Sequence, residues 1–204
     1  MTTDGTPSGG GGAIRGKLVK FNTEGRFFCG DADVTGGEFA VTGVLTCWLR
    51  WGDDGKPAEI RITQPGEDHP QRQDLPDQDE HNWPLGPDGK RADPWQDTRY
   101  LYLVAPTTAV EATFSTRSYG GHRAVADLKR QIATMRRVHP KAAPIIRLDA
   151  ERMRTKFGPK PKPLFTVIDW RGPETARIEP APPAASEDDG SPWSPGPSDE
   201  LIPV

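Results

Sequence analysis

Short runs of β-branched and aromatic residues alternate with turn residues over the first 117 positions of this chain. Such runs, bounded by Gly, Pro, Asn and Asp, are typical of β-strands joined by short turns. We therefore expect strands at 14–21, 26–30, 38–51, 58–63, 99–105 and 110–117. The segment 64–97 interrupts the series, and its many prolines and acidic residues predict an inserted acidic, Pro-rich loop.

The period of the apolar residues changes after residue 117. Four apolar residues recur at helical spacing: Val125, Leu128, Ile132 and Met135. This pattern predicts one amphipathic helix over 123–138. Two further strands are expected at 144–149 and 164–171, separated by a basic, Pro-containing loop at 151–163. Short strands with a single helix indicate a mainly β (α+β) protein, and they favour a small, partly open, OB-like β-barrel.

Both ends of the chain differ in composition from the segment between them. Residues 1–13 carry one charged side chain, and residues 172–204 are rich in Pro, Ser, Ala and acidic residues. Neither end can bury enough apolar surface to offset the entropy lost on ordering, so both are expected to be disordered tails. Residues 14–171 remain as one OB-like domain, large enough for a single hydrophobic core.

The sequence indicates neither a membrane protein nor a metal-binding protein. No apolar stretch approaches the roughly 18 residues of a membrane-spanning helix, and no signal-peptide pattern is present. We therefore expect no membrane contact and a cytoplasmic location. Cys29 and Cys47 lie in strand-like segments without a CxxC pair, which favours buried free thiols over a disulfide or a metal site.

Charge is distributed unevenly along the chain. The segment 115–171 holds fourteen Lys and Arg against four acidic residues, a net charge of +10. The segments 64–97 and 173–204 each carry a net charge of −6. A basic region beside acidic segments indicates a polyanionic partner that the domain binds and the tail mimics or repels. The alternative, that the basic residues only solvate a helix and a loop, stays open.

Aromatic residues on two strands are candidates for contact with bases. Alternation in the segment 45–51 places its apolar residues on one face, which we interpret as core, and Trp48 and Arg50 on the other. Tyr100 and Tyr102 form a second aromatic pair. Rings interleaved with Arg suit a binder of single strands, because every base offers a face for stacking. Burial in the core is the alternative for each ring.

The segment 118–123, SYGGHR, marks the change from strand to helix. Gly120 and Gly121 let the backbone approach a ligand, and free amides at a helix N-terminus favour a phosphate. Four basic residues are expected to contact the nucleic-acid backbone: Arg117, Arg123, Lys129 and Arg130. An equally open alternative is that the glycines only permit a tight turn into the helix.

Signatures of catalysis are missing from the sequence. The four histidines are scattered, and no HExxH, GxSxG or phosphate-binding GKS/GKT motif is present. Carboxylates in the 64–97 loop offer a conceivable hard-metal site, but acidic, Pro-rich loops are usually solvated. We therefore predict no catalytic residues, no metal and no cofactor.

The chain ends in an acidic and then apolar tip: Asp199, Glu200, Leu201, Ile202, Pro203 and Val204. This ending resembles the C-terminal tail of bacterial and phage single-stranded DNA-binding proteins, which ends in several acids, an apolar residue, proline and an aromatic. Ile202-Pro203 matches the Ile-Pro of that family, and Asp199-Glu200 matches its acids. Val204 stands where the family has Phe, and Leu201 replaces an acid. The segments 93–95 and 118–128 also look like parts of uncharacterised prophage proteins.

The resemblance implies that proteins of replication, recombination and repair dock this tip, with basic residues on its acids and an apolar pocket around its end. We therefore expect a phage or prophage single-stranded DNA-binding protein, without catalytic activity, that coats exposed strands and recruits such partners. Two alternatives stay open: an interaction adaptor that does not bind nucleic acid, and a Mg²⁺-dependent recombination nuclease. A homo-oligomer is possible, and the sequence does not decide the oligomeric state.

Overall fold

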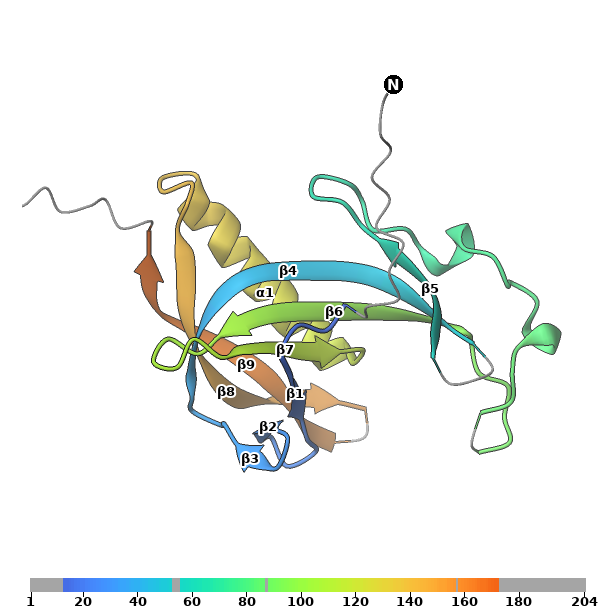
Figure 1. The fold of residues 1–204 in the computed structure, drawn as a ribbon. Coiled ribbons are helices and arrows are strands. Elements are labelled where there is room, and N and C mark those ends of the chain that lie inside the picture. Colours follow the sequence, from blue (N-terminus) through green and yellow to red (C-terminus); the bar gives the residue numbers. More distant parts are fainter. Residues whose placement is uncertain (1–12, 53–55, 87, 157, 173–204) are drawn as a thin grey trace, which may run out of the picture. The chain divides into compact units, whose positions relative to one another are not determined.

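The computed structural model describes residues 13–52, 56–86, 88–156 and 158–172. The expected disordered tails, 1–13 and 172–204, therefore lie outside the described residues except for Ala13 and Gly172. Within this part of the chain, nine strands and one α-helix form a mainly β structure, which confirms the predicted fold class (Figure 1). No helix in it is long and apolar enough to cross a membrane.

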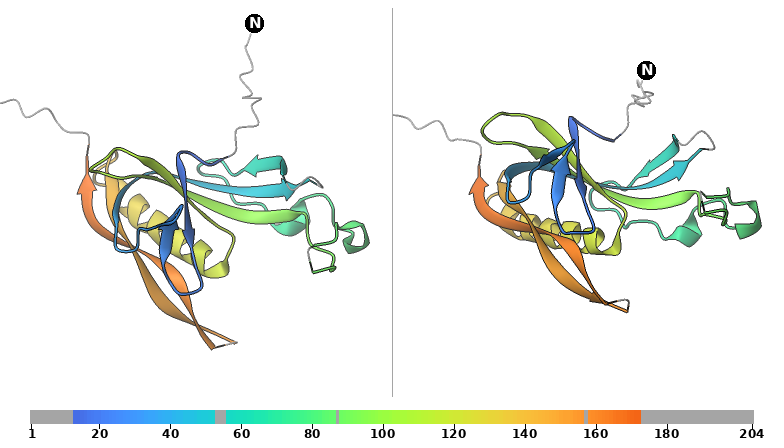
Figure 2. Two further views of the ribbon diagram at one scale, coloured as in Figure 1. Left: turned by 60° about the horizontal axis from the view of Figure 1, so that its bottom comes forward. Right: turned by 90° about the horizontal axis from the view of Figure 1, so that it is seen from below.

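The strands form one strongly curled sheet, an open half-barrel of the small OB-like kind that the sequence predicts (Figure 2). Their spatial order is β3 (Ala32–Asp33), β2 (Phe27–Cys29), β1 (Lys17–Phe21), β7 (Glu111–Thr116), β6 (Trp95–Val104), β4 (Glu38–Trp51), β8 (Ala143–Thr155) and β9 (Gly158–Arg171). The remaining strand, β5 (Pro57–Ile62), pairs with the second half of β4. Only β1 and β7 run parallel among these strand pairs.

The single helix, α1 (Tyr119–Arg136), begins four residues earlier than the apolar period indicates. Ser118 is its N-cap, and the Ser118 hydroxyl accepts a hydrogen bond from the Gly121 amide at 3.1 Å. This bond satisfies one of the amides that a helix N-terminus leaves unpaired. The segment SYGG is therefore the first turn of the helix and its cap, and not a separate turn before it.

The main core lies between α1 and the curled sheet. It consists of Val19, Phe27, Phe39, Val41, Leu101, Leu103, Ala112, Phe114, Ala124, Val125, Leu128, Ile132, Ile146, Leu148 and Phe165. The helical members recur at spacings of three and four, as one face of a helix requires. The amphipathic helix expected from the sequence therefore packs as predicted, with its apolar stripe on the sheet.

A β-bulge in β4 changes which side chains of that strand face α1. The register against β6 shifts between Val41 and Gly43. Val41 belongs to the main core, whereas Cys47 and Leu49 pack in a second, smaller cluster with Tyr100 on the other face of the sheet. The apolar face expected at 45–51 is therefore apolar, but it is not part of the main core.

The basic loop expected at 151–163 is instead a β-ribbon, the outer part of the β8–β9 hairpin. The two strands pair from Ala143↔Arg171 to Thr155↔Gly158 without a gap in the ladder after residue 146. Pro159, Pro161 and Pro163 led us to expect a loop. Because β9 is an outer strand of the sheet and the three prolines occupy alternate positions, their missing N–H groups do not interrupt the pairing with β8.

The acidic excursion between β5 and β6 has no strand of its own apart from one isolated bridge, Leu85↔Arg91, in its described part. It contains two 3₁₀ turns, η1 (Arg72–Asp74) and η2 (Glu80–Asn82). Figure 1 shows it beside β5, at the end of β4 away from β8 and β9. The loop predicted over 64–97 is therefore present, although its last residues belong to β6.

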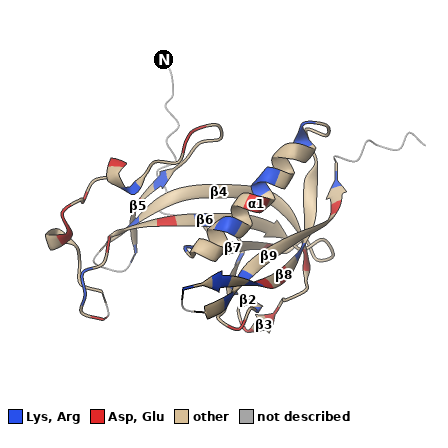
Figure 3. Cartoon of the chain, turned by 180° about the vertical axis from the view of Figure 1, so that it is seen from behind, with Lys and Arg blue, Asp and Glu red and all other residues tan. Residues whose placement is uncertain are grey.

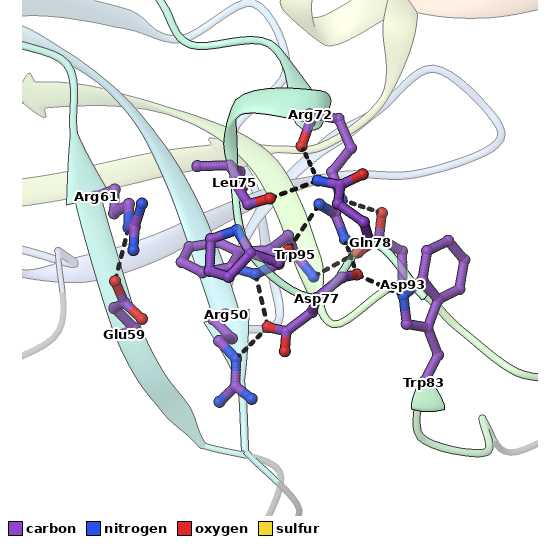
Figure 4. Close-up of polar contacts among 11 residues, drawn as sticks. Arg50, Glu59, Arg61, Arg72, Leu75, Asp77, Gln78, Trp83, Asp93 and Trp95 are labelled. Carbon is purple, nitrogen blue, oxygen red and sulfur yellow. Dashed lines mark hydrogen bonds and ion pairs between the residues drawn. The ribbon is translucent and has the colours of Figure 1, made fainter. Parts of the chain in front are cut away.

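Polar contacts hold this excursion together (Figure 4). Asp77 accepts hydrogen bonds from the Arg50 Nε at 2.8 Å and from the Trp95 indole N–H at 3.0 Å. Arg72 donates to the carbonyl oxygens of Pro76 at 2.9 Å and of Asp77 at 2.7 Å. The Trp83 indole N–H donates to the Asp77 carbonyl oxygen at 2.8 Å. Carboxylates of this loop are therefore used within the fold.

Candidate nucleic-acid interface

A groove of about 890 Å³ lies between α1, the strands β4 and β6, and the segment 63–69 that follows β5. Val44 of β4 and Ala126 of α1 contribute apolar surface to its walls. The bulge in β4 matters here, because it turns Val44 and Thr46 toward the helix. The groove therefore depends on a strand irregularity and on the helix that crosses above it.

Basic residues of α1 line one side of the groove. Arg123, Lys129 and Arg136 are exposed and line the groove; Lys129 and Arg136, about two helical turns apart, share one helix face. Figure 3 shows Lys and Arg at several positions along α1. Glu67 and Asp68 of the opposite segment are the acidic members of the lining. The helical side therefore carries the positive potential that an anionic chain requires.

One large aromatic side chain stands at the helical end of this groove. Tyr119 is 68% exposed, and the Arg123 guanidinium carbon lies 5.9 Å from the centroid of its ring. A single exposed ring is ordinary on a protein surface, so the cation beside it is what makes Tyr119 a candidate for binding. Tyr119 therefore offers a π-face beside a cation, and neither the helix nor the core needs that face for packing.

A charged cluster forms the floor of the groove and joins three elements. The Asp97 carboxylate of β6 lies 3.1 Å from the His69 Nε2, 3.1 Å from an Arg99 Nη2 and 3.7 Å from the His122 Nδ1. His69 belongs to the 63–69 segment, and His122 belongs to α1. The cluster therefore ties both sides of the groove to the sheet.

Three polar atoms of this cluster are shielded from solvent. His69 Nε2, Asp97 Oδ1 and His122 Nε2 are buried and have no hydrogen-bond partner among the described residues. The 3.1 Å separation of His69 and Asp97 is that of an ion pair, but its orientation is not that of a hydrogen bond. These three atoms do not reach the surface, but His69, Arg99 and His122 belong to the groove lining through other, partly exposed atoms.

Burial lowers the pKa of His69 from its ordinary value, while the Asp97 carboxylate opposes this shift and Arg99 adds to it. His69 is therefore neutral near pH 7. A neutral ring with its proton on Nε2 accepts at Nδ1 from the Thr63 hydroxyl, and these two atoms lie 2.6 Å apart. The 63–69 segment is thus anchored by an uncharged imidazole.

Trp48 and Arg50 share one strand face, as predicted, but both are engaged by the acidic excursion. The Trp48 ring stacks on His69 with centroids 5.5 Å apart and planes at 4°, and its N–H donates to the Pro70 carbonyl at 2.9 Å. Arg50 is held by Asp77. The half-buried Trp48 therefore already has a stacking partner inside the protein.

Tyr100 and Tyr102 lie on the sheet face away from α1. Tyr100 is 5% exposed and packs in the second cluster, and burial raises its pKa. Tyr102 is half-buried: its hydroxyl donates to the Ala13 carbonyl at 3.0 Å, and the Arg15 guanidinium carbon lies 4.4 Å from its ring centroid. A buried ring offers no face to a base, so the core alternative replaces the predicted role of Tyr100.

Gly120 and Gly121 serve close packing in this structure. A Cβ at Gly121 would lie 1.9 Å from the Thr116 Oγ1, and one at Gly120 would lie 2.8 Å from the Lys162 Cβ. The Gly121 amide is already used by Ser118. The expected phosphate loop at this helix N-terminus is therefore not supported by its surroundings.

The four basic residues predicted to contact phosphates separate into three places. Arg117 donates to the Gln96 side chain on the sheet face away from α1, so it does not meet Arg123. Arg130 pairs with Asp127 outside the groove lining. Arg123 and Lys129 line the groove together. Two of the four predictions thus converge on one surface.

Sequence reasoning did not single out Tyr119, His122, Arg99 or Arg136. Tyr119 and Arg123 are four residues apart, so a helix start at residue 119 would have placed them together. The cluster around Asp97 unites residues from positions 69 to 122, and no local pattern connects them. Cys29 and Cys47 are free thiols; Cys47 is buried as predicted, whereas Cys29 is half-buried, and burial raises the pKa of Cys47 to about 12.

Comparisons of the chain with protein-family models, with curated proteins and with solved structures found no match. The tail resemblance rests on Asp199–Val204, outside the described residues, and stays a prediction. Within the described ranges, no three His, Cys, Asp or Glu side chains form a group suited to a metal ion. The groove along α1 is thus the surface on which a functional proposal can be built.

Proposed function

We propose that this chain is a non-catalytic single-stranded DNA-binding protein and that the strand lies in the groove along α1. The observation that carries the proposal is the conjunction of an exposed aromatic ring with a row of cations on one side of the groove. Tyr119 offers the ring, and Arg123, Lys129 and Arg136 offer the cations. Single-strand binders of low sequence preference combine these two features.

Electrostatics and stacking have separate tasks in this proposal. Each Lys or Arg that neutralises a phosphate releases condensed counterions. The logarithm of the binding constant therefore falls by about 0.7 per contact for each tenfold rise in salt concentration. Stacking of a base on Tyr119 adds roughly 1–3 kcal/mol. The apolar wall at Val44 and Ala126 excludes water from the other side of a bound base.

The groove replaces the strand faces that the sequence suggested. Trp48 is stacked on His69, and Tyr100 is buried, so neither belongs to the proposed surface. Arg123 and Lys129 are retained from the sequence, while Tyr119 and Arg136 are added. The net charge of +10 in the segment 115–171 supports the choice of this side of the molecule.

Further parts of the proposal rest on the sequence alone. We place the protein in the cytoplasm of a phage-infected or prophage-bearing cell, where it coats exposed strands. Its tip, Asp199–Val204, would recruit replication or recombination proteins, as the tail resemblance implies. This segment lies outside the described residues.

The two other functions receive less support. A nuclease would use carboxylates of the 64–97 segment, but Asp77 and Asp93 are bound to Arg50, Arg72 and Trp95. An adaptor would present the same carboxylates to a basic partner. Because the excursion uses them to hold its own shape, single-stranded DNA binding through α1 is favoured.

Fluorescence anisotropy of labelled oligothymidylate tests the proposal. With the full chain and a strand of about 16 nucleotides, Tyr119→Ala should lose roughly 1–3 kcal/mol of binding free energy. Tyr119→Phe, which keeps the ring, should bind nearly as well as the wild type. Lys129→Ala should lower the salt slope by about 0.7, whereas Lys90→Ala, an exposed Lys of the excursion, should leave it unchanged.

Absence of salt-dependent binding would overturn the proposal. Equal affinity of the wild type and Tyr119→Ala would contradict the placement of the strand in the groove, because the Tyr119 ring would then contribute nothing to binding. Circular dichroism of each variant checks that the fold is retained, and retention is expected since Tyr119 and Lys129 are exposed.

A further inference from the structure

The strand β5 lies at an outer border of the sheet. It pairs with β4 and with no other strand of the described chain. The amide of Thr63, the residue just after β5, donates to the Thr46 carbonyl at 3.0 Å. Because the main-chain groups of an antiparallel strand alternate between its two borders, those of Ile60 and Ile62 point away from β4. The outer border of β5 therefore presents N–H and C=O groups that no described strand uses.

The acidic excursion that follows β5 does not cover this border in its described part. His69 stacks on Trp48, so the chain after β5 turns onto the sheet face that carries the groove. Figure 4 shows Arg61 of β5 to the left of Trp95 and Asp77 of the excursion to its right. Arg61 is exposed. The excursion therefore packs on a face of β4 and leaves the outer border of β5 accessible.

The side chains of β5 alternate between apolar and charged. Ile60 and Ile62 face away from α1, because their partners on β4 belong to the second cluster. Ile60 packs against that cluster, and Ile62 is 49% exposed. Glu59 and Arg61 lie on the opposite face, where the Arg61 Nε donates to the Glu59 Oε1 at 2.7 Å. An apolar patch thus reaches the border of the sheet on one face, and an acid and a base reach it on the other.

We propose that β5 pairs with β5 of a second copy of this chain, in an antiparallel two-fold dimer centred on Ile60. Two-fold symmetry sets each residue opposite the one at the same distance on the other side of the centre. Glu59 of each copy then lies opposite Arg61 of the other, and Ile60 lies opposite Ile60. Opposite charges directly across an antiparallel pair are stabilising. This inference is independent of the proposed function, because no nucleic acid takes part in the contact.

The charges of β5 select this register. A two-fold centre at Glu59 would set two glutamates opposite each other, and a centre at Arg61 would set two arginines opposite each other. Like charges directly opposite are destabilising. The main chain fits the centre at Ile60 as well, since its outward N–H and C=O can exchange both hydrogen bonds with the same groups of the second copy. β5 is therefore complementary to itself in charge, in apolar side chains and in main-chain groups.

An extended peptide of a different protein is the other occupant that a free strand border can take. Such a peptide would have to bring an acid and a base at the spacing that Glu59 and Arg61 require. A second copy brings both, at that spacing and in the reverse order. Charge complementarity therefore favours the second copy.

Sedimentation velocity of the full chain, without nucleic acid, tests the proposal. A contact between two short strands is small, and interfaces below about 1,200 Å² are typical of transient complexes. We therefore expect reversible monomer–dimer exchange over a concentration series from the micromolar to the millimolar range. E59R sets like charges opposite each other at both pairs, as R61E also does, and each variant alone should raise the dimer Kd roughly ten- to a hundredfold.

Two combinations of these variants should restore the dimer. The double variant E59R/R61E exchanges acid and base, so unlike charges are opposite again. An equal mixture of E59R and R61E should form mixed dimers, because one copy then carries two bases and the other carries two acids. R130E, which reverses an exposed charge of α1, is the matched control and should associate as the wild type does. Glu59 and Arg61 have partly exposed side chains, so the variants should fold, and circular dichroism checks this.

Hydrogen exchange of the wild type gives a reading that needs no variant. The Ile60 amide should exchange more slowly as the protein concentration rises, because it becomes bonded to the second copy, whereas the fully buried Leu101 should show no such dependence.

A wild type that stays monomeric through the millimolar range would overturn the proposal, as would an Ile60 amide whose exchange is independent of concentration. Association that E59R and R61E leave unchanged, or a mixture of the two that forms no mixed dimers, would also overturn it. None of these results bears on single-strand binding by the groove, so the dimer and the proposed function can fail separately.

Discussion

The half of the sheet beneath α1 and the half beside the 64–97 excursion are stabilised by different forces. Beneath α1, Phe27, Phe114 and Phe165 pack on one another with ring centroids 5.4–6.2 Å apart. Beside the excursion, the largest buried ring, Trp95, depends on a hydrogen bond to Asp77. The first region is held by apolar burial, and the second by directed polar contacts.

This difference predicts how each region fails. Apolar burial is shared by many neighbours, so a defect in the main core lowers the stability of the whole domain. A polar contact serves a few groups, and its loss leaves particular donors without a partner. We therefore expect global effects beneath α1 and local effects beside the excursion.

The largest effect is expected for Phe114→Ala. Phe114 is fully buried in the main core, and truncation of such a ring costs about 3–5 kcal/mol in transfer and cavity terms. Urea unfolding followed by circular dichroism measures the loss. Phe114→Leu should cost less, because it leaves a smaller cavity. A loss below about 1 kcal/mol, close to that of surface substitutions, would contradict the statement that apolar burial stabilises the region beneath α1.

A smaller and local effect is expected for Asp77→Ala. The Trp95 indole N–H, on a side chain that is 2% exposed, would lose its acceptor, which costs roughly 1–3 kcal/mol. Asp77 has a φ of 60°, which Asn tolerates, so Asp77→Asn is the matched control and should lose less.

Hydrogen exchange locates this loss. Amides of the excursion should exchange faster in Asp77→Ala, whereas those of α1 and β6 residues 101–104 should keep their protection. Uniformly faster exchange would show that the two regions unfold as one unit, and the distinction between them would be lost.

A third and weaker effect concerns pH. Burial lowers the pKa of His69 below its ordinary 6.5, so the folded protein binds fewer protons at this site than the unfolded chain does. The free energy of unfolding should therefore fall as pH drops from 6.5 toward the folded pKa. Asp97, Arg99 and His122 face the ring, and the net shift includes their charges.

Unfolding titrations of the wild type and His69→Gln test this sign. The variant should lack the part of the slope that begins at pH 6.5. Asp77, whose pKa is lowered first by its hydrogen bond from Arg50, contributes only below its ordinary 3.8, so the two windows are separate. A wild-type stability that rises as pH falls below 6.5 would contradict the assignment.

The smallest effect is expected for Arg130→Ala. Arg130 is exposed and pairs with Asp127 on the surface of α1. Pairs of this kind contribute about 0–1 kcal/mol, so thermal stability should change by no more than about 0.5 kcal/mol. Because Arg130 lies outside the groove lining, this variant also serves as a charge-matched control for Lys129→Ala. A large loss in thermal unfolding would show that surface charge supports the main core.

Local periodicity in the sequence predicted the elements with strong patterns. The strand at 38–51 matches β4, and the apolar stripe from Val125 to Ile132 lies on the sheet. These predictions succeed because alternation and helical spacing are properties of neighbouring residues. The mainly β class follows from them.

Features that depend on distant residues were not predicted. The bulge at Val41–Gly43 exchanges the two faces of β4, and its one local signal is Gly43, an isolated glycine within a strand pattern. Pro159 and Pro161 indicate a loop unless the strand is known to be an outer one. The placement of Trp48 on a base-binding face has the same limit, because His69, which covers the Trp48 ring, lies 21 positions later in the chain.

Two of the outer strands of the sheet, β3 and β9, have a consequence for self-association; β5, which pairs with β4 alone, is a third outer strand. Exposed strand borders invite pairing with another chain, and short borders or prolines discourage it. β3 has only two residues, and β9 lacks backbone donors at Pro159, Pro161 and Pro163. If the protein coats a strand in many copies, as we propose, its sheets are held at high local concentration. Blunted borders of this kind allow such crowding without growth of the sheets into aggregates.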